Sequence, residues 1–338
     1  MTNKLDYNLL KRLYSIHSPS GKEDKMINFI VSYIKTLPGK IEIRKDKYGN
    51  IYAWKGEAES YPCIVAHLDQ VQKTHSRDFK AIETRDIIFG YSPRSHSFEG
   101  LGADDKNGIL IALEALKNYD CIKIALFKEE EIGCRGSQQA EMSFFADCRF
   151  VIQCDRRGNS DLITSIGFTD LCSEDFIRAI NPEAWGYKEE SGLMTDVETL
   201  VENGLGVSAI NMSCGYFNPH TDEEITVKRD LEKCWRLVQH IIEDCAATYP
   251  HTPSEYGYYG RGYYDDWDME DEVWQQLSLD PTLTASDFYE LYHEACPYLT
   301  LYDYEQMIHG FQLMQEESND RTNNPNGTEE NNQEEIIF

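Results

Sequence analysis

The chain has 338 residues, of which 59 are acidic and 32 basic, so its formal net charge is −27. This excess of acid excludes broad nucleic-acid binding, since neutralising phosphates requires clustered Lys and Arg, and a hydrophobic fraction of 41% excludes wholesale disorder. The longest apolar stretches, such as CIVAHL and CIKIALF, are strand-sized and far shorter than the roughly 20 residues of a membrane helix, so we expect no membrane partner.

The first 250 residues alternate between segments of helical and of strand-like periodicity. Helical spacing of apolar residues comes first, and short apolar runs typical of doubly buried strands follow. The predicted segments are helices 7–16 and 22–36, strands 41–45, 51–54 and 63–66, helix 106–118, strand 122–127, helix 135–145, strand 150–154, helices 169–180 and 195–203, strand 206–212 and helix 228–247. This alternation predicts an α/β fold, a three-layer sandwich with a largely parallel, mixed central sheet.

The composition changes near Pro250. Residues 251–338 contain 20 acidic but only two basic side chains and hold 10 of the 21 tyrosines. We therefore predict a catalytic domain at 1–250 and an acidic, Tyr-rich helical extension at 251–317, with helices near 271–279, 286–295 and 302–317. The Asn- and Glu-rich residues 318–338 are predicted to be a disordered tail.

The ten cysteines and the amino-terminal segment indicate the compartment. The segment MTNKLDYNLLKRLYS lacks the apolar core of a signal peptide. The cysteines are scattered without a CxxC pair, and several lie in apolar strand-like runs. We expect a cytoplasmic protein with reduced, mostly buried thiols.

Acidic side chains and histidines gather where the predicted strands end. Ligands of open α/β sheets bind at the carboxyl ends of the strands, so these residues are expected to lie close together. They are His67 and Asp69 in AHLDQV, Asp104 and Asp105 in GADDKNG, Glu129, Glu130 and Glu131 in KEEEIG, Asp155 in QCD, and His220 in GYFNPHTDEE.

Each of these residues also has an ordinary structural explanation. A histidine after a strand is usually a surface or satisfied core residue, paired Asp residues often cap a helix, and a run of Glu is usually a solvated face. Taken together, five segments supply two histidines and three carboxylates, which suit a borderline divalent ion such as zinc. One carboxylate can bridge two metals about 3.5–4 Å apart, and cations would offset the mutual repulsion of the acids.

The chain resembles the co-catalytic zinc exopeptidase superfamily, which includes peptidase T, carboxypeptidase G-type enzymes, tetrahedral aminopeptidases and related deacylases. The matching motifs occur in the order of that superfamily and span roughly residues 5–230. They are SPSGKE, DKYGN, AHLDQV, GADDKNG, EEEIG, QCD and GYFNPHTDEE.

The resemblance implies a role for each matched residue. One zinc ion would be held by His67, Asp104 and Asp155, and the other by Asp104, Glu131 and His220. Asp69 would orient His67 from behind, and the peptide bond between Asp104 and Asp105 is a candidate for the cis form. Glu130 would be the general base acting on a hydroxide held by the two metals.

Other polar residues are assigned to the surface. Glu129 is an extra acid that we expect to be solvated, and His75 and His96 fall in a polar loop. His251 repeats the PHT string of His220 but lacks a preceding strand. Arg156 or Arg157 would bind a substrate carboxylate or form an ion pair with a nearby acid.

The spacing of the motifs favours one branch of the superfamily. There are 64 residues between Asp155 and His220 and 36 between His67 and Asp104, too few for the additional domains of several relatives. The resemblance therefore implies a metallopeptidase without a lid insertion, and an aminopeptidase acting on short peptides in preference to a carboxypeptidase. The alternatives are an amidohydrolase or deacylase of N-acyl amino acids with the same site, and a non-catalytic binding protein. The substrate side chain, the physiological metal and the oligomeric state stay open.

Overall fold

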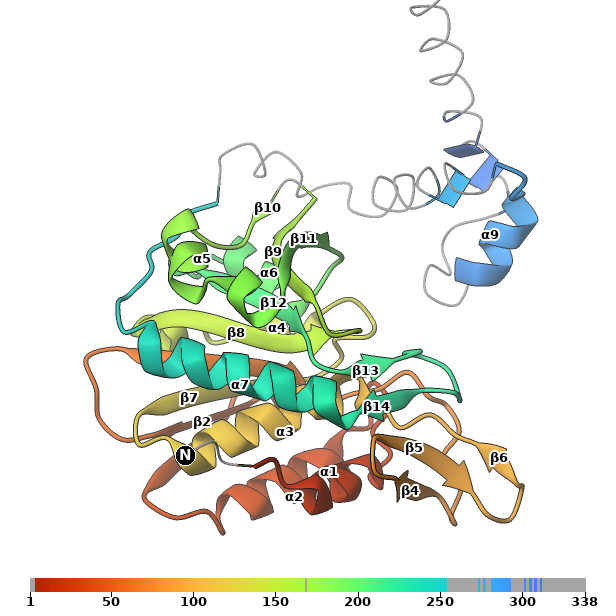
Figure 1. Ribbon diagram of the computed structural model, residues 1–338, viewed down its shortest axis with the longest axis horizontal. Coiled ribbons are helices and arrows are strands. Elements are labelled where there is room, and N and C mark those ends of the chain that lie inside the picture. The colour runs from red at the N-terminus through yellow and green to blue at the C-terminus, as the bar shows by residue number, and fades with distance from the viewer. Residues whose placement is uncertain are drawn as a thin grey trace, which may run out of the picture. The chain divides into compact units, whose positions relative to one another are not determined.

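A computed structural model describes residues 4–167 and 169–253 and, further along the chain, residues 273, 276–277, 281–292, 301, 304–305, 307–308 and 311. The chain divides into two compact units, Met1–Gly257 and Tyr258–Phe338, which are described separately. Figure 1 shows the helices and strands of the first unit packed in layers. No helix among the described residues is both long and apolar enough to span a membrane.

A nine-stranded mixed sheet forms the centre of the first unit, in the order β1-β2-β7-β3-β8-β12-β9-β10 with β11 paired to β9. Its four central strands, β7, β3, β8 and β12, are parallel to one another. The strands are β1 Ile41–Lys45, β2 Ile51–Lys55, β3 Tyr61–His67, β7 Ile122–Phe127, β8 Cys148–Arg156, β9 Asp161–Ile166, β10 Thr169–Asp170, β11 Lys188–Gly192 and β12 Ala209–Ser213.

Helices cover both faces of this sheet, which confirms the predicted three-layer α/β sandwich. Side chains of β3 alternate between two hydrophobic clusters, because successive residues of a strand point to opposite faces. Ile64 and Ala66 join the larger cluster, with α1, α2, α3 and α7, whereas Cys63 and Val65 join the smaller one, with α6. The helices of this unit are α1 Tyr7–Tyr14, α2 Asp24–Ile34, α3 Ala103–Asn118, α4 Arg135–Gln138, α5 Glu174–Ile180, α6 Asp196–Glu202 and α7 Lys228–Asp244, with short 3₁₀ helices η1 Met142–Phe145 and η2 Pro182–Trp185.

A second, antiparallel sheet occupies the region that the sequence predicts to be a polar loop. Its order is β13-β14-β5-β4, with β6 paired to β5. Its strands are β4 Lys80–Glu83, β5 Ile87–Ser92, β6 Ser97–Phe98, β13 Tyr216–Phe217 and β14 Ile225–Val227. Because β14 pairs with β5, this sheet ties the segment after His67 to the segment that follows His220.

Two predicted helices are wrong in part. The helix predicted at 135–145 breaks after α4, because the backbone N–H of Glu141 donates to the hydroxyl of Tyr52 at 3.0 Å and leaves the helical pattern. The helix predicted at 169–180 starts only at Glu174, since Thr169 and Asp170 pair with β9. Ser173 caps α5 by accepting a hydrogen bond from the backbone N–H of Phe176.

The second unit contributes one described helix, α9 (Ala285–Tyr292), close to the helix predicted at 286–295. Five of its described side chains form a small core of their own: Val273, Leu277, Phe288, Tyr304 and Met307. Most of the helix predicted at 271–279 and of the one at 302–317, and the whole tail at 318–338, lie outside the described residues. The nine cysteines of the described part are free thiols and all but Cys121 are buried, as predicted.

Candidate metal centre

Three of the five candidate ligands lie at or just after the carboxyl ends of parallel strands, as the sequence predicts. His67 is the last residue of β3, Asp155 lies near the end of β8, and Glu131 follows β7. Asp104 stands in the first turn of α3, and His220 follows β13 in a left-handed conformation with φ of 65°. Five segments far apart in the sequence thus meet at one edge of the sheet.

His67 is at the centre of this group and is fully buried. Its Nε2 lies 3.0 Å from Oδ1 of Asp104, 3.6 Å from Oδ1 of Asp155 and 3.9 Å from Oε2 of Glu130. Its other ring nitrogen, Nδ1, lies 3.3 Å from Oδ1 of Asp69. One ring edge therefore faces three acidic groups of the site, and the opposite edge faces Asp69.

His220 joins the group from the other side. Its Nε2 lies 3.2 Å from Oε2 of Glu131 and 3.4 Å from Oδ2 of Asp104. Asp104 thus presents one oxygen to His67 and the other to His220. This is the arrangement that a carboxylate bridging two ions requires, and it brings all five predicted ligands together.

Two sets of three ligand atoms lie within 4.8 Å of one another: His67, Asp104 and Glu131, and His67, Asp105 and Asp155. The second set contains Asp105 where the resemblance implies Asp104. Asp105 already accepts hydrogen bonds from the backbone N–H groups of His67 at 3.3 Å and Gly108 at 3.0 Å, so its carboxylate braces the start of α3. The peptide bond between Asp104 and Asp105 is cis, as predicted.

The electrostatics of the site show a shortage of positive charge. Burial, and then the charge of Asp104, raise the pKa of Asp155 well above its usual value, and burial likewise raises the pKa of Glu130. Hydrogen bonds with Asp104 and Glu131 raise the pKa of His220 to about 11.

The pKa of His67 is also raised. Burial opposes its protonation, but Asp155 and Glu130 nevertheless raise its pKa. Within the described part of the chain, the ion-pair partners of the acidic groups at the centre are His67 and His220. Oε1 of Glu131 is buried without a hydrogen-bond partner. The donor set is rich in carboxylates, has few cations beside it and leaves one candidate ligand oxygen without a hydrogen-bond partner. Such a donor set fits divalent metal ions.

Asp69 contacts both His67 and the loop that carries Glu130 and Glu131. Besides facing His67, it accepts hydrogen bonds from the hydroxyl of Ser20 at 2.7 Å and from the backbone N–H groups of Glu130 at 3.0 Å and Glu131 at 3.3 Å. Ser20 belongs to the SPSGKE motif, so that motif supports the loop that carries the two glutamates.

Four residues near the site are absent from the sequence-based prediction. Gln153 donates to Oδ2 of Asp155 at 3.0 Å, and the hydroxyl of Thr195 lies 3.4 Å from the same oxygen. Asp196 is fully buried at the start of α6, and burial raises its pKa to about 7. Glu224 accepts from the backbone at the start of α3. Asp196 lies at the start of a helix, where an acid is usually a cap. Glu224 lies in a run of acids, which usually faces solvent.

Some surface predictions need correction. Glu129 is not solvated, because its carboxylate accepts a hydrogen bond of 2.5 Å from the hydroxyl of Tyr48. His75 is sandwiched between two rings, with centroids 5.2 Å from His17 and 4.2 Å from Phe79.

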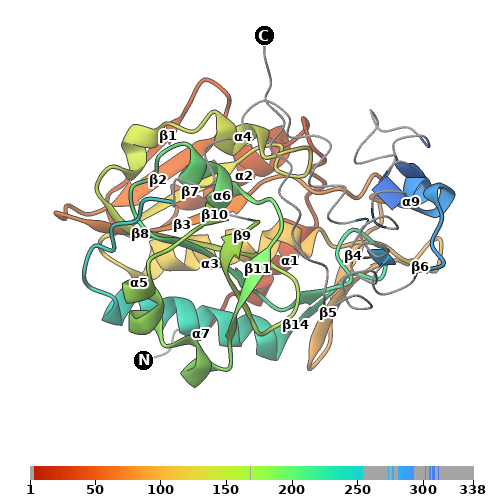
Figure 2. The same ribbon diagram turned by 90° about the horizontal axis from the view of Figure 1, so that it is seen from above.

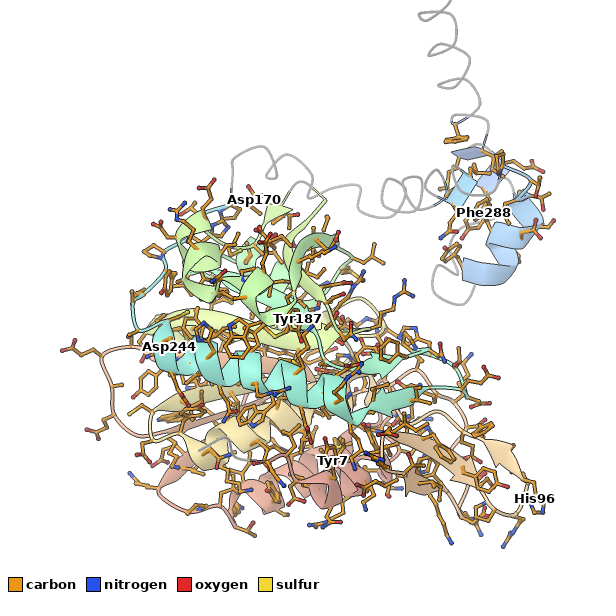
Figure 3. The ribbon with its side chains drawn as sticks, in the orientation of Figure 1. Tyr7, His96, Asp170, Tyr187, Asp244 and Phe288 are labelled. Carbon is orange, nitrogen blue, oxygen red and sulfur yellow. The ribbon has the colours of Figure 1, made fainter. Side chains whose placement is uncertain are left out.

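Three further residues lie outside the group of candidate ligands. His96 is exposed at the tip of the β5–β6 hairpin (Figure 3). His251 contacts the backbone carbonyl of Asp170 at 2.6 Å. Arg156 pairs with Asp161 at 3.3 Å, which is the second of the two roles considered for it.

Comparison with known proteins relates this geometry to a fold. The sequence matches no known family profile and no curated protein. Among solved structures, it is similar to a tripeptidase from Staphylococcus aureus with a TM-score of 0.57 at 14% identity, covering 71% of this chain and 99% of that chain. The chain therefore shares its fold with a protein described as a tripeptidase.

Two further solved structures match over similar lengths. A TET aminopeptidase from a marine sediment thaumarchaeon has a TM-score of 0.55 at 14% identity, with coverage of 70% of this chain and 96% of that chain. The aminopeptidase PepT from Bacillus cereus has a TM-score of 0.54 at 14% identity, covering 71% and 98% of the two chains. The shared fold therefore accounts for nearly the whole of each neighbour and for about seven tenths of this chain.

Proposed function

We propose that the protein is a dinuclear metallopeptidase that removes the N-terminal residue from short peptides. The observation that carries the proposal is the pair of histidines, His67 and His220, that face opposite oxygens of Asp104. The solved structures with this fold include proteins described as aminopeptidases and a tripeptidase, which supports a peptidase.

The five ligands divide into two sets that share Asp104. His67, Asp104 and Asp155 would hold one ion, and Asp104, Glu131 and His220 the other. Zinc suits this mixture of imidazole and carboxylate. Two such ions would polarise the carbonyl of the scissile peptide bond and lower the pKa of the attacking water.

Glu130 is the proposed general base. It is nine-tenths buried, and its Oε2 lies 3.9 Å from the ring of His67, so it borders the ligands without filling a ligand position. Burial raises the pKa of Glu130, which suits this role, because a carboxylate with a raised pKa can more readily accept the proton of water and then return it to the leaving amine.

Local charge favours an aminopeptidase over a carboxypeptidase. The segment that carries His220 continues with Asp222 and Glu223, both exposed. A substrate approaching this rim meets negative charge, which attracts the ammonium group at a peptide's amino end and repels the carboxylate at its carboxyl end. Asp69, held between His67 and the loop of Glu130, would keep the first ligand in position.

The test is a substrate comparison with zinc-reconstituted protein. Free-amine dipeptides and tripeptides, the same peptides with an acetylated amino end, and N-acyl amino acids are incubated with the protein, and release of amine is measured. We expect cleavage of the free-amine peptides with release of the first residue. Cleavage of N-acyl compounds alone would replace the aminopeptidase by a deacylase, and cleavage of none would leave a binding protein.

A further inference from the structure

Large apolar side chains are exposed at few positions in the described part of the first unit. They are Phe98, Ile132, Leu193 and Met194. A single exposed apolar residue is ordinary, but several close to one functional site indicate a binding surface. Three of these four residues lie in loops that lead directly to the candidate metal centre.

Ile132 lies in the loop after β7. It directly follows the candidate ligand Glu131, and 43% of its surface is exposed. The next residue, Gly133, has open space where a side chain would be, with no atom within 4 Å of an added Cβ. This stretch therefore has room for a ligand beside an apolar side chain.

Leu193 and Met194 lie in the loop between β11 and α6, and are 68% and 57% exposed. The next residue, Thr195, points its hydroxyl inward, 2.9 Å from Oε1 of Gln153 and 3.4 Å from Oδ2 of the candidate ligand Asp155. The two apolar side chains are thus one and two residues away from a contact with the metal centre.

The two loops lead into two helices that pack against each other. The loop of Ile132 leads into α4, and the loop of Met194 leads into α6, which lies beside α4 (Figure 2). The side chain of Asn203, just past the end of α6, donates to the backbone carbonyl of Ser137 in α4 at 3.4 Å. Near the start of α4, the thiol of Cys134 lies 3.6 Å from Oε1 of Glu130, so this end of α4 borders the candidate base.

We propose that Ile132, Leu193 and Met194 form a subsite that receives an apolar side chain of the substrate's N-terminal residue. This inference rests on the proposed function and gives it a substrate class, namely peptides that begin with residues such as Leu, Met or Phe. Each methylene group held in an apolar pocket typically contributes about 10- to 200-fold to discrimination. Because these side chains form an open rim, we expect leucine to be preferred over alanine by about 10- to 100-fold in kcat/KM.

The kinetic test compares the wild type with the double variant Leu193→Ser/Met194→Ser and with the single variant Ile132→Thr. The substrates are leucine and alanine amides of one chromogenic amine. We expect the ratio of kcat/KM for leucine over alanine to fall at least fivefold in the double variant. The control is Phe98→Ser, which alters an apolar residue of similar exposure, 53%, on β6. An unchanged ratio in the double variant and in Ile132→Thr would overturn the subsite.

A binding measurement separates this inference from the proposed function. Leucinol and alaninol carry the same side chains and free amine but no bond to cleave, and their binding to metal-free and zinc-loaded protein is measured by calorimetry. Tighter binding of leucinol that is lost in the double variant supports the subsite even if no peptide is cleaved. Equal binding of both, combined with cleavage that ignores the first side chain, contradicts the subsite and leaves the peptidase proposal intact. Equal binding with no cleavage contradicts both.

Discussion

Glu224 accepts a hydrogen bond of 3.1 Å from the backbone N–H of Asp104, the residue whose carboxylate faces both histidines. The same buried carboxylate accepts from the backbone N–H of Gly102 at 2.6 Å and from the side chain of Gln72 at 3.2 Å. Glu224 therefore fixes the backbone that presents Asp104, although it lies four residues beyond His220. Loss of a positioning group of this kind typically lowers metal affinity about 10- to 100-fold.

We predict that Glu224→Gln weakens zinc binding without removing a ligand. The amide offers only one acceptor oxygen, so a buried N–H loses its partner at a cost of about 1–3 kcal/mol, which corresponds to roughly 5- to 150-fold in affinity. Zinc dissociation constants are measured by competition with a chelator. The matched control is Glu223→Gln, which alters the exposed neighbour. Equal affinities in the two variants would contradict the positioning role of Glu224.

The neighbours Glu130 and Glu131 should respond differently to the same substitution. Glu131→Gln should lose one metal, because a neutral amide is a poorer zinc ligand than a carboxylate. Glu130→Gln should keep both metals and lower turnover by about 100- to 10,000-fold, the typical contribution of a general base. Metal content and turnover under saturating zinc are measured for both. The assigned roles are wrong if Glu130→Gln loses metal and Glu131→Gln retains it.

His220 and His251 occur in the same PHT string and provide a matched pair of alanine substitutions. His220→Ala should reduce the zinc content from two ions per chain to about one, because His220 contacts Asp104 and Glu131. His251→Ala should leave the zinc content unchanged, since the ring of His251 contacts the carbonyl of Asp170 instead. Elemental analysis after dialysis measures the difference. Loss of metal from His251→Ala alone would mean that the wrong histidine has been assigned.

The acidic carboxy-terminal part is expected to be separable from the metal centre. All five candidate ligands lie within Met1–Gly257. We predict that a chain ending at Gly257 folds and binds two zinc ions, as measured by circular dichroism and elemental analysis, with the full chain as control. An unfolded or metal-free product would show that the remaining residues belong to the catalytic domain.

The sequence predicts the central strands well, because strands that are buried on both faces consist of continuous apolar runs. The strand predicted at 122–127 has the observed bounds of β7, Ile122–Phe127, and both this strand and β3 are buried throughout. The sequence does not predict the strands of the second sheet, because β4 and β6 are short and largely exposed, and because β5, with which both pair, has its third partner β14 more than 120 residues away in the chain. Pairing over such a distance leaves no local periodicity to detect.

That the candidate ligands lie close together could also be predicted, since strand ends converge at one edge of a parallel sheet. The supporting acids could not. Asp196 and Glu224 are fully buried in the structure, yet an acid at a helix start or within a run of acids usually faces solvent. Whether such a carboxylate is buried depends on the tertiary packing around it, and the sequence contains no local sign of that packing.

The order of strands in the central sheet also determines when the site can form during synthesis. β3 lies between β7 and β8, which both follow it in the chain, so its last residue, His67, has no ligand neighbours when it leaves the ribosome. The set is complete only when His220, residue 220 of 338, has been made and β14 has paired with β5. Domains with such long-range pairing fold slowly. A growing chain that has not reached residue 220 therefore lacks one of the five candidate ligands, and the proposed two-metal centre cannot be complete while that part of the backbone is still being made.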